Sequence, residues 1–304
     1  MFMQTTQSHY KMIFISFIIP VYNTPKELLE RCLQSIRALP LEPNQREIII
    51  VDDGSDAPYN VSDAKVIRQE HQGVSQARNE GMKHAQGTYI QFIDADDELA
   101  LNHYRAVLIT LWKKQPDILA FAFNTAHRRP RPWGISSGTH YLRHYNIFGS
   151  VCAYTFQRQL IQNYTFNPQL SYGEDEEFTA KVLLDSKRLI VMDRPAYFYH
   201  KTKSSVTAQH KAEAIQQRLN DTFAVIRNLD WYLYHLEGAQ YKALQRRIRC
   251  LACDYLHNTK RLIANKKERK AALEQAKEQL RSLSLYPLPL KFYSLRYLLT
   301  ALRG

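Results

Sequence analysis

Short apolar runs that alternate with helical patterns dominate the first two thirds of this 304-residue chain. Three of these runs are rich in β-branched residues and are typical of strands buried on both faces: Ile13 to Tyr22, Glu47 to Val51 and Tyr89 to Ile93. Residues 24–36 and 75–86 have the composition and spacing of helices. Strands and helices in this alternation predict an α/β fold, with a mainly parallel sheet flanked by helices. Two further strands are predicted over residues 65–69 and 117–124.

The tetrapeptide Asp94-Ala95-Asp96-Asp97 places three carboxylates directly after one of these buried strands. Carboxylates this close together repel each other unless a cation lies between them. Mg²⁺ and Mn²⁺ are commonly held by one or two carboxylates together with substrate phosphates. A second acidic loop, Asp52-Asp53-Gly54-Ser55-Asp56, also follows a strand, and ligands of such sheets bind at the carboxyl ends of the strands. The alternative is a solvated turn that caps the next helix.

The positive charge lies in the last third of the chain. Residues 211–304 contain 18 Lys and Arg against 8 Asp and Glu, whereas residues 1–210 contain 23 against 21. The tail has a helical pattern, and Leu285 to Leu299 mixes leucines, aromatics and cations as segments in a membrane interface do. Three roles stay open for the tail: contact with an anionic membrane surface, packing on the rest of the protein, or binding to nucleic-acid phosphates. Its predicted helices are Asp221–Leu236, Tyr241–Ala264 and Lys266–Leu283.

The cysteines and the apolar N-terminal run indicate a cytoplasmic protein. Four cysteines with uneven spacing do not form a disulfide framework, which favours a reducing compartment. The apolar run from Ile13 to Ile19 is about half the length of a membrane span, and Pro20 ends it. No small-residue cleavage site follows that run, so no signal peptide is expected.

Four sequence signatures occur in order along the chain. They are Ile18-Ile19-Pro20-Val21-Tyr22-Asn23, then Val51-Asp52-Asp53-Gly54-Ser55, then Gln72-Gly73-Val74-Ser75-Gln76-Ala77-Arg78-Asn79 with the acidic turn downstream, and Gly173-Glu174-Asp175 at the start of a later helix. This ordered set resembles the family 2 glycosyltransferases over about residues 13–205. The resemblance implies a GT-A fold over residues 1–210 that binds a nucleotide-diphosphate sugar, and leaves residues 211–304 as a basic helical region.

The resemblance also implies roles for particular residues. Asp96 would be the ligand of Mn²⁺ or Mg²⁺, with Asp97 as a helper, and Asp175 would be the general base beside Glu174, which would contact a sugar. His200 stands where relatives often have Arg, so it would approach the metal or the diphosphate, or serve as a structural hydrogen-bonding group. His71-Gln72-Gly73 likewise replaces a more usual N-x-G. The implied nucleotide-sugar-binding residues are Pro20, Tyr22, Asn23, Asp52, Asp53, Arg78, Asp94 and Ala95.

The chemistry of glycosyl transfer requires these residue types. A departing nucleoside diphosphate gains negative charge, which a metal and a cation such as Arg78 stabilise. The attacking hydroxyl must lose its proton to a base on the opposite side of the sugar, which is the role implied for Asp175. Inversion at the anomeric carbon is implied by the family alone.

The sequence therefore predicts an inverting, metal-dependent hexosyltransferase of cell-surface polysaccharide synthesis. Its donor would be a UDP-sugar and its acceptor a hydroxyl of a glycan or a lipid-linked molecule. The expected location is the cytoplasm, peripheral on the inner face of the membrane, with no nucleic acid bound. One alternative is a sugar nucleotidyltransferase, but such an enzyme needs a Gly-rich phosphate cradle, and the loop from Pro20 to Pro25 contains no glycine. The other alternative is a basic nucleic-acid-binding protein.

Overall fold

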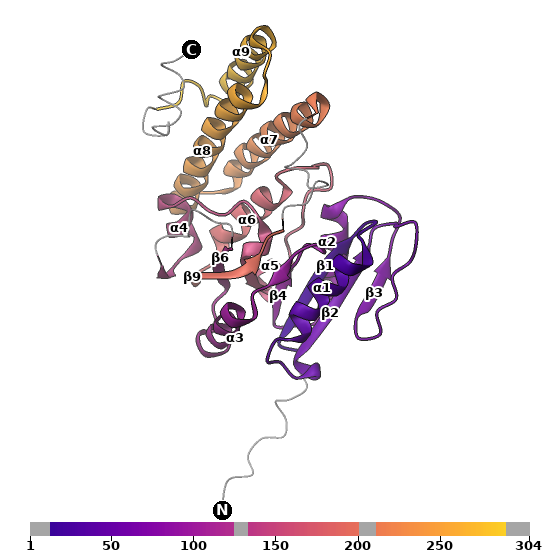
Figure 1. Cartoon of the computed structure of the whole chain (residues 1–304). Helices are drawn as coiled ribbons and strands as arrows, with labels where there is room; N and C mark the ends of the chain where they lie inside the picture. Colours follow the sequence, from indigo (N-terminus) through magenta and orange to yellow (C-terminus); the bar gives the residue numbers. More distant parts are fainter. Residues whose placement is uncertain (1–12, 125–132, 201–210, 290–304) are drawn as a thin grey trace, which may run out of the picture.

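A mixed β-sheet flanked by helices forms the centre of the molecule in the computed structural model, which describes residues 13–124, 133–200 and 211–289 (Figure 1). The strand order is β3-β2-β1-β4-β8-β6-β9-β5, and β7 pairs with β9. The strands are β1 (Ile15–Val21), β2 (Arg46–Asp52), β3 (Lys65–Arg68), β4 (Tyr89–Phe92), β5 (Glu98–Leu99), β6 (Ile118–Phe123), β7 (Gly134–Ser136), β8 (Tyr154–Gln157) and β9 (Leu189–Phe198). The helices are α1 (Lys26–Arg37), α2 (Val74–His84), α3 (Leu101–Lys114), α4 (Gly138–His144), α5 (Arg158–Ile161), α6 (Glu174–Asp185), α7 (Ala212–Tyr232), α8 (Gly238–Leu262) and α9 (Lys266–Ser282), with short 3₁₀ turns η1 (Pro43–Gln45), η2 (Val151–Ala153) and η4 (Leu233–His235).

The parallel half of the sheet matches the sequence prediction. Strand β1 pairs in parallel with β2 and β4, and β2 pairs in parallel with β3. Their carboxyl ends therefore lie at one edge, where Val21 pairs with Asp52. The other half is mixed, because β8 runs antiparallel to both β4 and β6 while β9 runs parallel to β6. The expectation of a mainly parallel sheet thus holds for β3-β2-β1-β4 and is incomplete beyond β4.

Apolar side chains explain why β1 and α2 lie together. Phe17, Ile18 and Ile19 of β1 are fully buried, as expected for a strand covered on both faces. Helix α2 packs on β1 and β2. A Cβ added at Gly81 of α2 would lie 2.4 Å from the Ile18 side chain, so only glycine permits this close approach. The approach fixes α2 against the sheet and brings Arg78, one turn earlier, to the edge of the sheet.

The C-terminal helices α7, α8 and α9 form a layer beyond α4 and α6, far from β2 and β3 (Figure 1). Helix α8 packs on α4, α6, α7 and α9, and it buries Leu244, Ile248 and Leu256 completely. The prediction of helices here is confirmed, although α7 begins at Ala212, earlier than expected. The expected interfacial segment from Leu285 to Leu299 lies outside the described residues after position 289. Among the helices that are described, none is long and apolar enough to cross a membrane.

Candidate functional site

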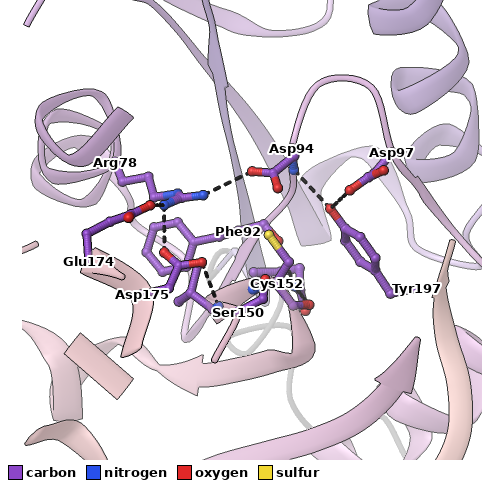
Figure 2. Close-up of polar contacts among 11 residues, drawn as sticks. Arg78, Phe92, Asp94, Asp97, Ser150, Cys152, Glu174, Asp175 and Tyr197 are labelled. Atoms are coloured by element: carbon purple, nitrogen blue, oxygen red, sulfur yellow. Dashed lines mark hydrogen bonds and ion pairs between the residues drawn. The ribbon is translucent and has the colours of Figure 1, made fainter. Parts of the chain in front are cut away.

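Arg78 contacts carboxylates of two segments, the turn after β4 and the first turn of α6 (Figure 2). Its Nη2 lies 3.0 Å from Asp94 Oδ1, and its Nη1 lies 2.9 Å from Glu174 Oε1 and 2.6 Å from Asp175 Oδ1. The Arg78 side chain is only 4% exposed, and its guanidinium also lies over the Phe166 ring. Burial acts to lower the pKa of Arg78, but the three carboxylates hold it well above its ordinary value. A permanent cation therefore links the turn after β4 to the start of α6.

Asp175 is held in a fixed orientation at the first turn of α6. Its Oδ2 accepts a hydrogen bond of 3.0 Å from the Val151 backbone N–H, while its Oδ1 faces Arg78. Burial raises the pKa of Asp175 to about 7, against the opposing effect of Arg78, and Glu174 and Asp94 add to the rise. A general base works best when its pKa is close to the operating pH. The environment of Asp175 thus suits a group that exchanges a proton.

The acidic start of α6 has a local cause. The helix begins after Gly173, whose φ of +83° is readily adopted by glycine, and its first turn is Glu174, Asp175, Glu176 and Glu177. Carboxylates at a helix N-terminus are favoured by the partial positive charge there. Packing of α2 then brings Arg78 to the first two of these residues.

Asp97 anchors the turn after β4 through hydrogen bonds to Tyr197 and His200. Tyr197 donates its hydroxyl to Asp97 Oδ2 at 2.8 Å, and the His200 backbone N–H donates to Asp97 Oδ1 at 2.8 Å. The Tyr197 oxygen also accepts the Asp94 N–H at 3.0 Å (Figure 2). Burial raises the pKa of Asp97 to about 8, with Asp94 adding to the rise. Asp97 therefore fixes the turn to the end of β9.

The His200 imidazole points to a neighbouring side chain. Its Nε2 lies 2.7 Å from Glu98 Oε1, and Arg31 Nε lies 3.0 Å from the same oxygen. Arg31 also donates to the Asp96 carbonyl at 2.7 Å. The backbone of His200, not its ring, is what contacts Asp97. A metal-binding role for His200 stays a prediction, and it would require the ring to leave Glu98.

Mn²⁺ or Mg²⁺ fits the oxygen donors that this turn presents. The carboxylates of Asp94 and Asp96 belong to half-buried residues, and the Asp94 side chain is 38% exposed. The Ala95 side chain between them is buried. Within the described ranges, no three His, Cys, Asp or Glu side chains form a group that could hold a metal. The protein would thus supply one or two carboxylates, and substrate phosphates would complete the shell.

Asp52 presents an unsatisfied acceptor at the end of β2. Its Oδ1 accepts the Ser55 N–H at 2.9 Å. Its Oδ2 is buried without a hydrogen-bond partner among the described residues, and Arg68 Nε lies 3.7 Å away. A buried acceptor without a partner costs free energy unless a ligand or water satisfies it. This atom is therefore a candidate contact for a ligand N–H.

Asp53, in contrast, organises the loop that precedes α2. Its Oδ1 accepts from Gln69 Nε2 and the Gln72 N–H, and its Oδ2 accepts from the Gly73 N–H. The His71 Nδ1 lies 2.9 Å from Asp53 Oδ2. These contacts show how the sequence His71-Gln72-Gly73 is held in place.

Tyr22, Asn23 and Pro20 lie beside Asp52 at the same edge. Tyr22 is 49% exposed and stacks on the His71 ring at 4.0 Å between centroids. Asn23 has a left-handed backbone with φ of 48°, and its Oδ1 accepts the Asp56 N–H at 2.9 Å. Pro20 is half-buried on β1. Five of the residues predicted for nucleotide-sugar binding, Pro20, Tyr22, Asn23, Asp52 and Asp53, therefore lie at the ends of β1 and β2, whereas Arg78 lies on α2 and Asp94 and Ala95 follow β4.

Sequence reasoning assigned no role to several residues of this region. Tyr197 falls in a segment that the family resemblance noted, but its contact with Asp97 spans 100 positions. Val151 had no signal in the sequence, because only its backbone N–H takes part. The His71 ring stacks on Tyr22, a contact that the sequence does not indicate.

Comparisons with known proteins indicate the family and the fold. Residues 16–165 match the model of the glycosyl transferase family 2. The Bacillus subtilis glycosyltransferase EpsJ is 27% identical over 234 residues, which cover 69% of this chain and 67% of EpsJ. The minor teichoic acid biosynthesis protein GgaB of the same species is 26% identical over 226 residues, but these are only 25% of its length.

Solved structures show the same fold. Staphylococcus aureus TarS 1-349 in complex with UDP-GlcNAc superposes with a TM-score of 0.64 at 18% identity, covering 89% of this chain and 81% of that one. A mannosyltransferase from Pyrobaculum calidifontis in complex with GDP-Man and Mn²⁺ gives a TM-score of 0.53 at 16% identity, covering 95% of this chain and 79% of that one. The predicted GT-A fold with a helical C-terminal region is confirmed. Residues 16–165 belong to the glycosyl transferase family 2, and the chain is a glycosyltransferase.

Proposed function

We propose that the protein is an inverting, metal-dependent hexosyltransferase that moves a sugar from UDP to a hydroxyl of a glycan or lipid-linked acceptor. The observation that carries the proposal is the position of Arg78, which contacts Asp94 on one side and Asp175 on the other. The acidic turn and the start of α6 are thereby parts of one site. Such a site has the two functions that transfer requires, charge stabilisation at the leaving group and proton removal at the acceptor.

Asp52 and Arg68 support uracil as the base. Asp52 Oδ2 has no hydrogen-bond partner in the part of the chain that the structure describes, so it can accept one N–H, and Arg68 beside it can donate to a carbonyl. Uracil presents one N–H between two carbonyl groups, which matches this pair. Guanine would present two adjacent donors, but the Ser55 N–H already occupies the second oxygen of Asp52. The exposed ring of Tyr22 offers a stacking surface next to these groups.

A divalent metal would be held by Asp96, with Asp94 beside it. When bound, it would neutralise negative charge on the diphosphate. Asp97 would fix the turn through its bonds to Tyr197 and His200. Arg78, through its contact with Asp94, would keep the carboxylates of the turn oriented toward the donor.

Asp175 would act as the general base. The acceptor oxygen forms a bond to the anomeric carbon, its proton moves to the Asp175 carboxylate, and the bond to the diphosphate breaks. The carboxylate is 13% exposed, so one face can meet an acceptor, and its raised pKa allows it to hold the proton that it takes. No covalent intermediate is needed, which predicts inversion of configuration. Glu174, which shares Arg78, would contact a sugar hydroxyl.

The acceptor class and the location are proposed from the named relatives and from the charge of the C-terminal region. The relatives GgaB and TarS are named for teichoic acid and poly(ribitol-phosphate) polymers, which supports a cell-surface polysaccharide acceptor. Residues 211–304 contain 18 Lys and Arg but only 8 Asp and Glu, and this positive charge supports binding to the anionic inner face of the membrane. In this proposal residues 1–210 form the catalytic region and residues 211–304 form the basic region.

A panel of UDP-sugars and GDP-sugars tests the donor and the metal together. Release of the nucleoside diphosphate would be measured with Mn²⁺, with Mg²⁺ and with a chelator. We expect turnover with one or more UDP-sugars, loss of turnover in the chelator, and recovery when the metal is restored. Turnover of GDP-sugars alone would contradict the role of Asp52, and full turnover in the chelator would contradict the role of the metal.

A further inference from the structure

The four carboxylates that begin α6 face two different parts of the molecule. Glu174 and Asp175 contact Arg78 in the site. Glu176 turns the other way and accepts two hydrogen bonds from Arg247 of α8, from Nε to Oε1 at 2.7 Å and from Nη2 to Oε2 at 2.8 Å. Glu177 accepts from Asn228 of α7 at 3.0 Å. The C-terminal helices thus hold the same helical turn that carries the proposed base.

Arg246, next to Arg247 on α8, contacts the segment that leads to Val151. Arg246 donates through Nη1 to the carbonyls of Leu142 and Tyr145 at 3.1 and 3.0 Å, at the end of α4. The loop after Tyr145 leads to Val151, whose N–H donates to Asp175. Two consecutive arginines of α8 therefore contact the first turn of α6 and the start of the loop that leads to Val151.

The geometry of the Glu176–Arg247 pair serves orientation more than stability. Both side chains are nearly buried, at 9% and 8% exposed. A buried ion pair gains little over apolar side chains of similar volume, because desolvation offsets the attraction. A bidentate guanidinium–carboxylate pair, however, fixes direction as well as distance. Glu176 adjoins Asp175 in the chain, and a displacement of about 1 Å in a catalytic group can cost on the order of 100-fold in rate.

We propose that Arg247, acting through Glu176, is a positioning residue that orients Asp175 for proton removal. The inference rests on the proposed role of Asp175 as the base. It makes the basic C-terminal region a working part of the active site, in addition to any contact that this region makes elsewhere.

The test replaces both members of the pair. In Glu176→Met with Arg247→Met the buried charges disappear together, so neither partner is left unpaired. Lys242→Met is the control, because Lys242 is an exposed cation on the same helix. Titration with UDP in Mn²⁺ counts folded binding sites, and UDP release from the UDP-sugar turned over fastest gives kcat and KM across pH.

We expect kcat per UDP-binding site to fall about 10- to 100-fold in the double variant, with KM for the UDP-sugar changed by less than about twofold. The acid limb of the kcat profile should shift, because a displaced Asp175 changes both its burial and its contacts with Arg78 and Val151, which together set its pKa. A loss of folded protein alone would leave kcat per site and the acid limb unchanged. Lys242→Met should match the wild type.

Unchanged kcat per site and an unchanged acid limb in the double variant would overturn the inference. If the double variant does not fold, Arg247→Lys replaces it, since it keeps the charge but loses the fork; a several-fold loss of kcat supports the inference, and no change overturns it. Asp175→Asn in the same assay separates the two proposals. If that variant keeps turnover, the proposed base is wrong; if it loses turnover while the double variant does not, only the role of Arg247 is wrong.

Discussion

Replacing Asp175 by Asn should change the stability of the fold in a way that depends on pH. Arg78 lies 2.6 Å from the Asp175 carboxylate, and an ion pair of this kind ordinarily lowers a carboxyl pKa. Burial and the neighbouring carboxylates outweigh it, so the pKa of Asp175 rises from 3.8 to about 7. Three carboxylates surround one guanidinium, and Asp175→Asn removes one of the excess negative charges.

The direction in which stability changes with pH follows from proton binding. An acid whose pKa is higher in the folded state than in the unfolded state binds more protons when folded, so its contribution to stability is full below pH 3.8 and is lost as the pH rises through about 7. Each unit of difference is worth about 1.4 kcal/mol. From about pH 5 to about pH 9, the wild type should therefore lose roughly 3 kcal/mol of unfolding free energy relative to Asp175→Asn.

Urea unfolding of both proteins at several pH values measures this difference. Asp56→Asn removes an exposed carboxylate and controls for the loss of one negative charge. We expect the difference between Asp175→Asn and the wild type to shift in favour of the variant as the pH rises. A difference that stays flat, or that shifts in favour of the wild type, would show that Arg78 dominates and that the pKa of Asp175 is not raised.

Three further outcomes are expected. The rate kcat/KM should fall below about pH 7, because a protonated Asp175 cannot accept the acceptor proton; a profile flat down to about pH 5 would contradict this. Asp96→Asn should bind UDP more weakly than the wild type in Mn²⁺, but as well as the wild type in a chelator, as measured by calorimetry. A variant that binds UDP as tightly as the wild type in Mn²⁺ would show that the turn is only structural. Asp52→Asn should lower the affinity for UDP by about 10-fold or more, because the base N–H loses its acceptor, while the affinity for inorganic pyrophosphate stays the same. Equal losses for UDP and pyrophosphate would argue against contact with the base.

Local sequence patterns were sufficient for the elements that build the parallel half of the sheet. The apolar runs over 13–22, 47–51 and 89–93 became β1, β2 and β4 within two residues at each end. These strands are buried on both faces, so burial and composition give the same signal. The acidic loops at their ends were placed correctly at one edge, because parallel strands have their carboxyl ends together.

Long-range pairing explains what the sequence left out. Strand β8 inserts antiparallel between β4 and β6, and nothing in Tyr154–Gln157 encodes that neighbour. Glu98–Leu99 pairs with β9 as β5, directly before α3 begins at Leu101. This pairing depends on residues about 100 positions away, so no local pattern in the sequence indicates it.

Among the site residues too, local motifs predict which residues take part, whereas their contacts depend on long-range packing. Arg78 was predicted near the diphosphate from its motif, whereas its contacts with Glu174 and Asp175 span 96 and 97 positions. Asp52 and Asp53 are adjacent and chemically identical. Among the described residues, one oxygen of Asp52 has no hydrogen-bond partner, whereas both oxygens of Asp53 accept hydrogen bonds from the loop before α2. Only the packed structure distinguishes them.

Turnover and donor binding by Asp175→Asn, measured side by side, test the proposed mechanism most directly. UDP binding in Mn²⁺ would be measured by calorimetry, and UDP release from the UDP-sugar turned over fastest would be measured at about pH 8. We expect UDP binding within a few-fold of the wild type and a loss of turnover of about 10²- to 10⁴-fold, as for a missing general base. Turnover close to that of the wild type would contradict the role of Asp175, as would lost binding with undiminished turnover at saturation.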